Sequence, residues 1–289
     1  MNSMASKRIT KDVVEKFGFN FTKSLGQNFL VDEHVLEKIV DGSLVEEGDY
    51  VMEIGPGIGT LTRELGKRAK KVITIEIDRK LIPILEDTLS DMENIKVVNQ
   101  DILKVDLFEL LKEEFESKPF KVVANLPYYI TTPIIMKFLE EGHPMELMVI
   151  MIQKEVAHRM AAKPGGKEYG ALSVAVQYYC EVDIVANAPK GAFMPPPNVD
   201  STVIRLKRRT SIPWELKDRD LFFKTVKAGF SKRRKTLLNA LSSSDLNISK
   251  EGVKEILEIV EIQESRRAET LDMSEFAKLA NGVYDYLNR

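Results

Sequence analysis

The stretch Val51-Met52-Glu53-Ile54-Gly55-Pro56-Gly57-Ile58-Gly59-Thr60 decides the fold of this chain. An apolar strand pattern leads into a glycine-rich turn, and a helical pattern follows it at Leu61–Arg68. Gly55 and Gly57 allow the backbone to approach a ligand that a Cβ atom would exclude. Their G-x-G-x-G spacing differs from the dinucleotide G-x-G-x-x-G, and Glu53 at the strand end would repel phosphate but suit a sulfonium or α-amino group. The alternative is a tight strand-to-helix turn that binds nothing.

Apolar runs alternate with helical patterns on both sides of this stretch. Seven runs rich in β-branched or apolar residues are predicted strands: Tyr50–Ile54, Val72–Ile77, Ile95–Asn99, Phe120–Ala124, Met145–Gln153, Leu172–Tyr179 and Ser201–Lys207. Helices are expected at Glu33–Val40, Leu61–Arg68 and Leu81–Leu89, where Pro83 falls in a first turn. This alternation predicts an α/β, Rossmann-like fold with a mostly parallel sheet and an antiparallel pair at its edge.

The composition changes after about Thr210, where strand patterns cease. Helical spacing is present in four later segments: Leu221–Phe230, Arg233–Leu241, Lys250–Val260 and Ser274–Leu287. We therefore predict two domains, an α/β domain at residues 1–209 and a small all-helical domain at 210–289. Within the first, residues 1–30 are basic and end in the aperiodic run Lys23–Leu30, which predicts a loop or arm.

Bulk composition limits the class of protein. The chain has 289 residues, 44% of them hydrophobic, which is enough for a sizeable core. Its longest weakly polar stretch, Val122–Met136, is too short and too interrupted by proline to span a bilayer. The N-terminus lacks the apolar region of a secretory signal, and a single cysteine, Cys180, fits a reducing cytoplasm. The three histidines are scattered, so we expect no metal site.

The charge is unevenly distributed. The formal net charge is -2, which taken alone argues against a nucleic-acid partner. Between Arg205 and Ala240, however, twelve basic residues face only three acidic ones. We predict that this segment contacts phosphates, and the alternative is a solvated helix face. The residues chosen for RNA binding are Arg205, Arg208, Lys232, Arg233, Arg234 and Lys235.

Two further acids end predicted strands. Glu76 ends the second strand about 20 residues after Gly55, where an acid can accept hydrogen bonds from both hydroxyls of a ribose. Asp101 follows the third strand, where a carboxylate can accept from an adenine amino group. As single residues, both are more often solvated acids. Because the carboxyl ends of parallel strands share one edge, together they predict an adenosine site there.

The fourth strand ends in Asn125-Leu126-Pro127-Tyr128. The amino nitrogen of adenine is a poor nucleophile because its lone pair is delocalised into the ring. The Asn125 carbonyl and a backbone carbonyl can accept both amino hydrogens and hold the lone pair toward a methyl donor, while Pro127 stiffens the turn. Tyr128 can stack on an extruded base. The alternative is a strand-breaking turn with core aromatics.

In these motifs the chain resembles the ribosomal RNA adenine dimethyltransferases, and the small-subunit group in particular. The resemblance covers nearly the whole length and rests on ordered segments: Leu25–Leu30, Glu53–Gly57, Ile75–Asp78, Gln100-Asp101, Asn125–Tyr128, Gln153–Ala157, Tyr169–Val174, Phe193–Ser201 and Arg233–Leu237. It implies a Rossmann-like methyltransferase fold with a seven-stranded, mostly parallel sheet. It also implies S-adenosylmethionine as the cofactor.

The resemblance assigns roles to individual residues. It implies that cofactor contacts come from Asn28, Leu30, Gly55, Glu76, Asp101 and Asn125. It implies a catalytic set of Asn125, Leu126, Pro127, Tyr128 and Phe193, in which Tyr128 and Phe193 sandwich the target base. The arm would reach the cofactor through Asn28 and Leu30, Gly55 would lie under its methionine end, Glu76 would hold the ribose and Asp101 the adenine.

The implied substrate is a pair of adjacent adenines in a loop near the 3′ end of small-subunit rRNA, methylated at N6 during ribosome biogenesis. We expect a cytoplasmic monomer whose partner is the small-subunit rRNA or its precursor particle, without membrane or metal. One alternative is the macrolide-resistance group, which methylates large-subunit rRNA. Others are an assembly factor with secondary catalysis, and an NAD oxidoreductase, which the glycine spacing disfavours.

Overall fold

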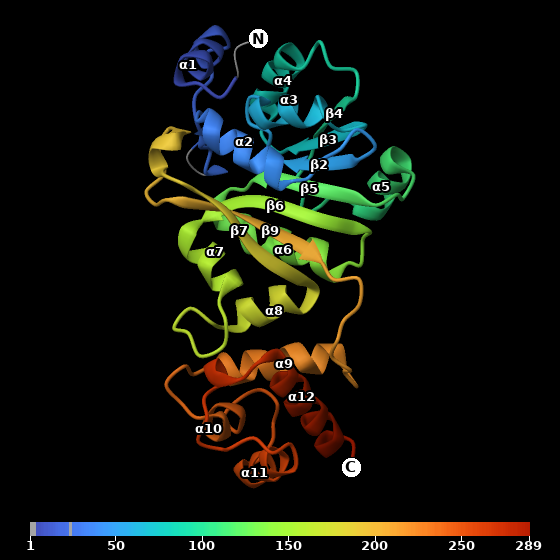
Figure 1. The fold of residues 1–289 in the computed structure, drawn as a ribbon, viewed down its shortest axis with the longest axis vertical. Coiled ribbons are helices and arrows are strands. Elements are labelled where there is room, and N and C mark those ends of the chain that lie inside the picture. The colour runs from blue at the N-terminus through green and yellow to red at the C-terminus, as the bar shows by residue number, and fades with distance from the viewer. Residues whose placement is uncertain (1–3, 23–24) are drawn as a thin grey trace. The chain divides into compact units, whose positions relative to one another are not determined.

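The computed structural model describes residues 4–22 and 25–289, and its central feature is a seven-stranded sheet (Figure 1). The strands are β2 (Tyr50–Ile54), β3 (Lys71–Glu76), β4 (Ile95–Asn99), β5 (Phe120–Asn125), β6 (Met145–Gln153), β7 (Cys180–Ala188) and β9 (Ser201–Arg208). Their spatial order is β4-β3-β2-β5-β6-β9-β7. The pairs from β4 to β6 are parallel, and β9 runs antiparallel to β6. The predicted Rossmann-like architecture is confirmed.

Helices cover both faces of this sheet, because its strands are apolar on both sides. Helices α2 (Glu33–Gly42) and α3 (Thr60–Gly66) share one hydrophobic cluster with Val51. On the other face, α5 (Leu107–Phe115) and α6 (Thr131–Glu140) contribute aromatic side chains. There the Phe115 ring lies 5.1 Å from that of Tyr50. Since successive residues of a strand point to opposite faces, Tyr50 and Val51 serve the two layers.

The carboxyl ends of the parallel strands lie at one rim, and short elements follow each strand there. A turn leads from β2 into α3, and η2 (Arg79–Leu81) leads from β3 into α4 (Ile82–Thr88). The Asp78 side chain caps η2 by accepting from the Lys80 amide, and Pro83 occupies the first turn of α4, where no donor is needed. After β5, η3 (Tyr128–Ile130) opens α6.

The N-terminal arm is more structured than predicted. Residues Lys7–Lys16 form α1, capped by the Ser6 hydroxyl and tied to α4 by an ion pair between Lys16 and Asp87. The sequence analysis predicted no helix for these residues, whose mean polarity hides a narrow apolar stripe. Further on, β1 (Phe29–Leu30) pairs antiparallel with β8 (Phe193–Met194). The predicted arm residues Lys23 and Ser24 lie outside the described residues.

One predicted strand is a helix. Leu172–Tyr179 lies within α8 (Ala171–Tyr179), so the prediction was wrong, although the total of seven strands in the sheet was right. The Ser173 hydroxyl accepts from the Gly170 amide, a local bond that stabilises the start of the helix. The true edge strand is β7, which follows directly, and α7 (Lys154–Ala161) precedes the α8 segment.

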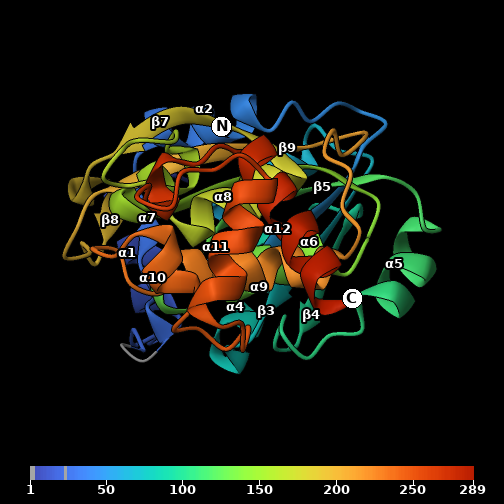
Figure 2. The same cartoon turned by 90° about the horizontal axis from the view of Figure 1, so that it is seen from below.

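The chain divides into two compact units. The first comprises Met1–Ala157 and Glu181–Arg208, and the second comprises His158–Cys180 and Arg209–Arg289. The second unit contains α8 and four later helices, α9 (Arg219–Phe230), α10 (Leu237–Leu241), α11 (Lys250–Ile259) and α12 (Met273–Leu287), which form one group around α12 and α9 (Figure 2). The predicted boundary after residue 209 falls beside this division, but residues 158–180, predicted in the first domain, belong to the second unit.

Short 3-10 segments complete the described elements. They are η4 (Lys190–Ala192), which precedes β8, and η5 (Ala268–Thr270), which precedes α12. Among the described residues, no helix is both long and apolar enough to cross a membrane.

Candidate active site

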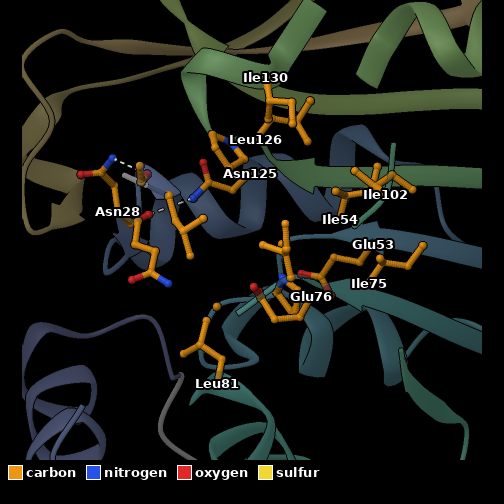
Figure 3. A pocket seen from close by; sticks show the side chains of 18 of the residues that line it. Asn28, Glu53, Ile54, Ile75, Glu76, Leu81, Ile102, Asn125, Leu126 and Ile130 are labelled. Carbon is orange, nitrogen blue, oxygen red and sulfur yellow. Dashed lines mark hydrogen bonds between the residues drawn. The ribbon is translucent and has the colours of Figure 1, made fainter. Parts of the chain in front are cut away.

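A pocket opens at the carboxyl rim of the sheet, and four strands contribute to it. Gly55 follows β2, Glu76 ends β3, Asp101 follows β4 and Asn125 ends β5, and all four line the pocket. Figure 3 shows the Glu76 and Asn125 side chains projecting toward this pocket from two different strand ends. The arm lines it too, through Leu25–Leu30. The fold therefore places the residues that were predicted from separate sequence motifs around one pocket.

The glycine turn forms the floor next to β2. Gly55 and Gly57 have φ values of +70° and +60°, a region that side chains other than glycine rarely adopt. A Cβ atom on Gly57 would stand 3.0 Å from the Phe29 ring of the arm. The turn therefore needs glycine both for its conformation and for the close approach of the arm.

Glu53 is a buried carboxyl beneath this turn. It lines the pocket with only 1% of its surface exposed, and its Oε2 has no hydrogen-bond partner among the described residues. Burial raises the pKa of Glu53 to about 8, an effect that the facing hydroxyls of Thr62 and Thr74 only partly offset. An unpartnered buried acid facing a pocket suits a cationic ligand, which would restore the charged form.

Glu76 is the acid at the end of β3. One carboxylate oxygen accepts from the Asp78 amide at 2.7 Å, which fixes the side chain at the rim. Burial, helped by the nearby Asp78 charge, outweighs the opposing effect of the backbone amides, including that of Gly57, and raises the pKa of Glu76 to about 7. Its position allows the carboxylate to accept hydrogen bonds from a ligand.

Gln27 and Asp78 connect the arm to this acid, a link that the sequence prediction did not assign. The Gln27 amide donates to Asp78 Oδ2 at 2.7 Å, and its carbonyl accepts from the Thr22 amide at 2.7 Å. Both residues lie in motifs that carried the family resemblance, which was the available signal. Asp78 thus joins the arm to Glu76, whose carboxylate accepts from its backbone.

Asp101 lies where the third strand ends. Its Oδ1 accepts from the Leu103 amide at 3.0 Å, and its side chain remains 24% exposed at the pocket. The buried Ile102 and the exposed Ile77 line the pocket beside it. Apolar side chains of this kind can pack against a flat ring, and the Asp101 carboxylate can accept a hydrogen bond at the edge of that ring.

Asn125 lies opposite the acids, and the arm holds its amide. Asn125 Nδ2 donates to the backbone carbonyl of Asn28 at 3.1 Å, as the dashed line in Figure 3 shows. The Asn28 side chain in turn donates to Gly26 O at 3.0 Å. Because this hydrogen bond orients the Asn125 amide, its Oδ1 can accept from a substrate. Leu30, buried at the end of the arm, also lines the pocket.

The rest of the tetrapeptide forms a held turn. Leu126 is buried, and its amide donates to Met151 O on β6 at 3.2 Å. Pro127 O accepts from the Ile130 amide and the Thr131 hydroxyl. Tyr128 is half-buried and lines the pocket.

Phe193, the predicted partner of Tyr128 in the base sandwich, lies beside the arm. It is 3% exposed, belongs to the hydrophobic cluster under α2 and is not among the residues that line the pocket. Its backbone pairs with Leu30 of the arm. Of the two predicted sandwich residues, Tyr128 lines this pocket and Phe193 does not.

The predicted RNA-binding residues fall into two groups. Arg205 on β9 pairs with Asp183 at 3.0 Å, and Arg208 donates to the carbonyls of Phe138 and Leu139 near the end of α6. These two arginines have protein partners. The others form an exposed basic turn between α9 and α10, which consists of Lys232, Arg233, Arg234 and Lys235. Within that unit, Arg233 donates to the Lys167 carbonyl.

No cluster of three or more His, Cys, Asp or Glu side chains that could hold a metal ion occurs in the part of the chain that the structure describes. Cys180 is buried. The polar side chains that line the pocket carry carboxylate, amide and hydroxyl groups.

The fold and the site together define a class. The sheet is mostly parallel and has an antiparallel strand next to β6, and its carboxyl rim carries a glycine turn and acidic residues. These features are characteristic of a Rossmann-like methyltransferase. A family model described as ribosomal RNA adenine dimethylase matches residues 18–279. The chain belongs to this ribosomal RNA adenine dimethylase family, and the resemblance predicted from its motifs is confirmed.

Individual relatives and solved structures support the same family assignment. A protein of Clostridioides difficile named ribosomal RNA small subunit methyltransferase A is 58% identical over 281 residues, which cover 97% of this chain and 97% of the relative. A crystal structure of a dimethyladenosine transferase from Plasmodium falciparum aligns with a TM-score of 0.75 and 30% identity, covering 87% of this chain and 95% of the other. The crystal structure of the 23S rRNA methyltransferase ErmE aligns with a TM-score of 0.69 and 27% identity, covering 89% and 100%.

Proposed function

We propose that this protein transfers methyl groups from S-adenosylmethionine to N6 of two adjacent adenines in a loop near the 3′ end of small-subunit rRNA. The observation that carries the proposal is the Asn125 amide, held by Asn28 O at the pocket rim that also contains Glu76. An amide fixed in this way can present an acceptor to an exocyclic amino group. The names of the high-identity relatives favour the small subunit.

The pocket residues fit S-adenosylmethionine. Gly55 and Gly57 leave room for its methionine end, Glu76 would accept from the ribose hydroxyls, and Asp101 would accept from the adenine amino group. Glu53, whose Oε2 has no partner among the described residues, suits the positive charge of the molecule. When bound, the cofactor supplies an electrophilic methyl group. Asn28 and Leu30 would close the pocket from the arm.

The residues of this chain act on the target base mainly by holding it. Asn125 Oδ1 and a backbone carbonyl of the same turn accept the two N6 hydrogens, which orients the nitrogen lone pair. Leu126 and Pro127 keep that turn rigid through their backbone hydrogen bonds. Tyr128 offers a ring face to an extruded base. No titratable base is needed, because the methylated amino group is acidic and gives its proton to water.

We infer that the RNA is held mainly by the basic turn Lys232–Lys235, whose four residues are exposed. Arg205 and Arg208 are weaker candidates, since both are only partly exposed. Affinity supplied by phosphate contacts should fall steeply with salt concentration. We further propose that the protein acts as a monomer in the cytoplasm, on the small-subunit rRNA or its precursor particle.

Binding of the cofactor should depend on pH through Glu76. Because burial raises the pKa of Glu76 to about 7, the carboxylate that accepts from the ribose is the minor form at pH 6. Ionisation of Glu76 alone should therefore raise the affinity for S-adenosylhomocysteine about tenfold between pH 6 and pH 8, and ionisation of Glu53, whose pKa is about 8, should add a further rise around pH 8. Isothermal titration calorimetry across this range measures it. In Glu76→Gln the affinity should be weak at both pH values, and an equally steep rise in this variant would contradict the assignment.

The substrate is tested by methyl incorporation. Unmethylated small and large ribosomal subunits are incubated separately with the protein and labelled S-adenosylmethionine, and digested rRNA is analysed by mass spectrometry. We expect N6-dimethyladenosine in adjacent pairs in small-subunit rRNA only. Label confined to the large subunit would instead support a function like that named for ErmE. Binding to small subunits without methyl transfer would indicate an assembly factor.

A further inference from the structure

The ring of Tyr128 is held at its far end by a residue from a different part of the chain. The Tyr128 and Ser201 hydroxyl oxygens are 2.7 Å apart and share a hydrogen bond. We propose that Ser201 is a positioning residue for methyl transfer, which fixes the plane of the Tyr128 ring against the target adenine. This inference rests on the proposed function, since it requires a base to stack on Tyr128.

Ser201 is a rigid anchor. It is fully buried at the start of β9 and lies opposite Gln153 in a ladder of seven residue pairs with β6. Its neighbour Asp200 reinforces this position, because Asp200 O accepts from the Lys154 amide at 3.0 Å. Asp200 Oδ1 accepts from the Lys190 amide, also at 3.0 Å. A side chain in such surroundings has little freedom to move.

The Tyr128 side chain is held by this anchor at its hydroxyl end. Its backbone belongs to the turn that the Pro127 carbonyl organises by accepting from the Ile130 amide and the Thr131 hydroxyl. The side chain is only half-buried, so packing restrains the ring on one side only and does not fix its orientation. With the backbone held at one end and the hydroxyl at the other, the ring keeps one orientation before the base arrives.

The state of the hydroxyl fits this role. Burial raises the pKa of Tyr128, so the phenol is neutral at physiological pH and can donate to or accept from Ser201. The hydrogen bond also satisfies Ser201, whose hydroxyl would otherwise be buried without a partner. A ring oriented in advance loses less conformational freedom on stacking, which favours the reactive geometry of the base.

The chain offers a matched control. Thr202, the next residue of β9, is equally buried, and its hydroxyl donates to Asn187 Oδ1 on β7 at 3.1 Å. Because successive strand residues face opposite sides, this hydroxyl serves the other face of the sheet. Thr202→Val therefore removes a comparable buried hydrogen bond without touching Tyr128.

The test is a double-mutant cycle on the full-length protein with small ribosomal subunits as substrate. We expect Ser201→Ala and Tyr128→Phe each to lower kcat about tenfold, while KM for the subunit and the Kd of S-adenosylhomocysteine change less than about twofold. The kcat of the combined variant should also be about tenfold below that of the wild type, because both substitutions remove the same hydrogen bond. Thr202→Val should keep the wild-type kcat, even if its melting temperature falls as far as that of Ser201→Ala.

Several results would overturn the proposal. One is a kcat of Ser201→Ala that equals that of Thr202→Val, and another is a combined loss of about a hundredfold, which would mean independent effects. Since Tyr128→Phe leaves Ser201 intact, an unchanged kcat in that variant also overturns it, even if Ser201→Ala does not fold. Wild-type protein that transfers no methyl group would overturn the proposed function and this inference together, whereas the other results leave the proposed function standing.

Discussion

Asn125→Ala is expected to lower the rate of methyl transfer about 10²- to 10³-fold, the range typical of losing one pre-organised polar group at a reacting centre. The structure gives the reason. Asn125 Nδ2 is bound to Asn28 O, so the side-chain carbonyl is oriented before any base arrives. Without it, the N6 amino group keeps its lone pair in the ring. Single-turnover methyl transfer to small subunits at saturating cofactor measures the effect.

Two further variants sharpen this prediction. Asn125→Asp keeps the shape but loses the donor to Asn28 O, so it should be nearly as slow as the alanine variant. Asn94→Ala removes another part-buried asparagine, whose amide donates to Gly66 O and Ala69 O away from the pocket. This control should retain wild-type transfer. A rate for Asn125→Ala within threefold of the control would contradict the proposed role of Asn125.

Glu76→Ala is expected to weaken cofactor binding at least a hundredfold. A buried carboxylate that accepts two hydroxyl hydrogens contributes two charge-assisted hydrogen bonds, and each is stronger than a neutral one. The affinity for S-adenosylhomocysteine at pH 8, measured by calorimetry, reports the loss. Methyl transfer at low cofactor concentration should fall by a similar factor, and a higher concentration should restore part of it.

The controls for this variant separate binding from folding. Glu76→Gln retains an oxygen to accept from the Asp78 amide, so it should fold normally and still bind the cofactor weakly. Glu86→Gln changes an exposed acid of α4 and should bind as wild type does. Wild-type affinity in Glu76→Ala would show that this carboxylate does not hold the ribose.

Most of the sheet could be predicted because its strands are buried on both faces. Runs such as those at β2 and β5 are continuous, β-branched and bounded by turns, so their pattern is distinctive. Leu172–Tyr179 was wrongly predicted as a strand because a buried helix can show the same continuous apolar pattern. Helix α8 carries β-branched and aromatic residues and buries several sides, so it shows no clear helical period. The adjoining edge strand β7 is half-exposed and charged, and it was missed.

The candidate site was predictable in its parts but not in its connections. Strand order places the residues after β2, β3, β4 and β5 at one rim, and general rules for parallel sheets give that rim. The bond from Asn125 to Asn28 O and the link from Gln27 to Asp78 join segments far apart in the sequence. No local pattern reports such contacts.

The surroundings of Phe193 and Arg208 could not be predicted for a similar reason. Phe193 is an aromatic residue in a matching motif, yet the pairing of β8 with β1 places it in the core of the first unit. Arg208 belongs to a basic run, yet its guanidinium reaches the carbonyls near the end of α6. In both cases the tertiary neighbours, rather than the residue type, decide what the side chain touches.

The central claim is that one rim of the sheet brings the methyl donor and the target adenine together. A crystal structure of the protein with S-adenosylhomocysteine tests it most directly. We expect the ligand in the pocket between the Gly55–Gly57 turn and Asn125, with both ribose hydroxyls bound to Glu76 and the adenine edge at Asp101. A ligand bound elsewhere, or in this pocket with its sulfur turned away from Asn125, would contradict the account.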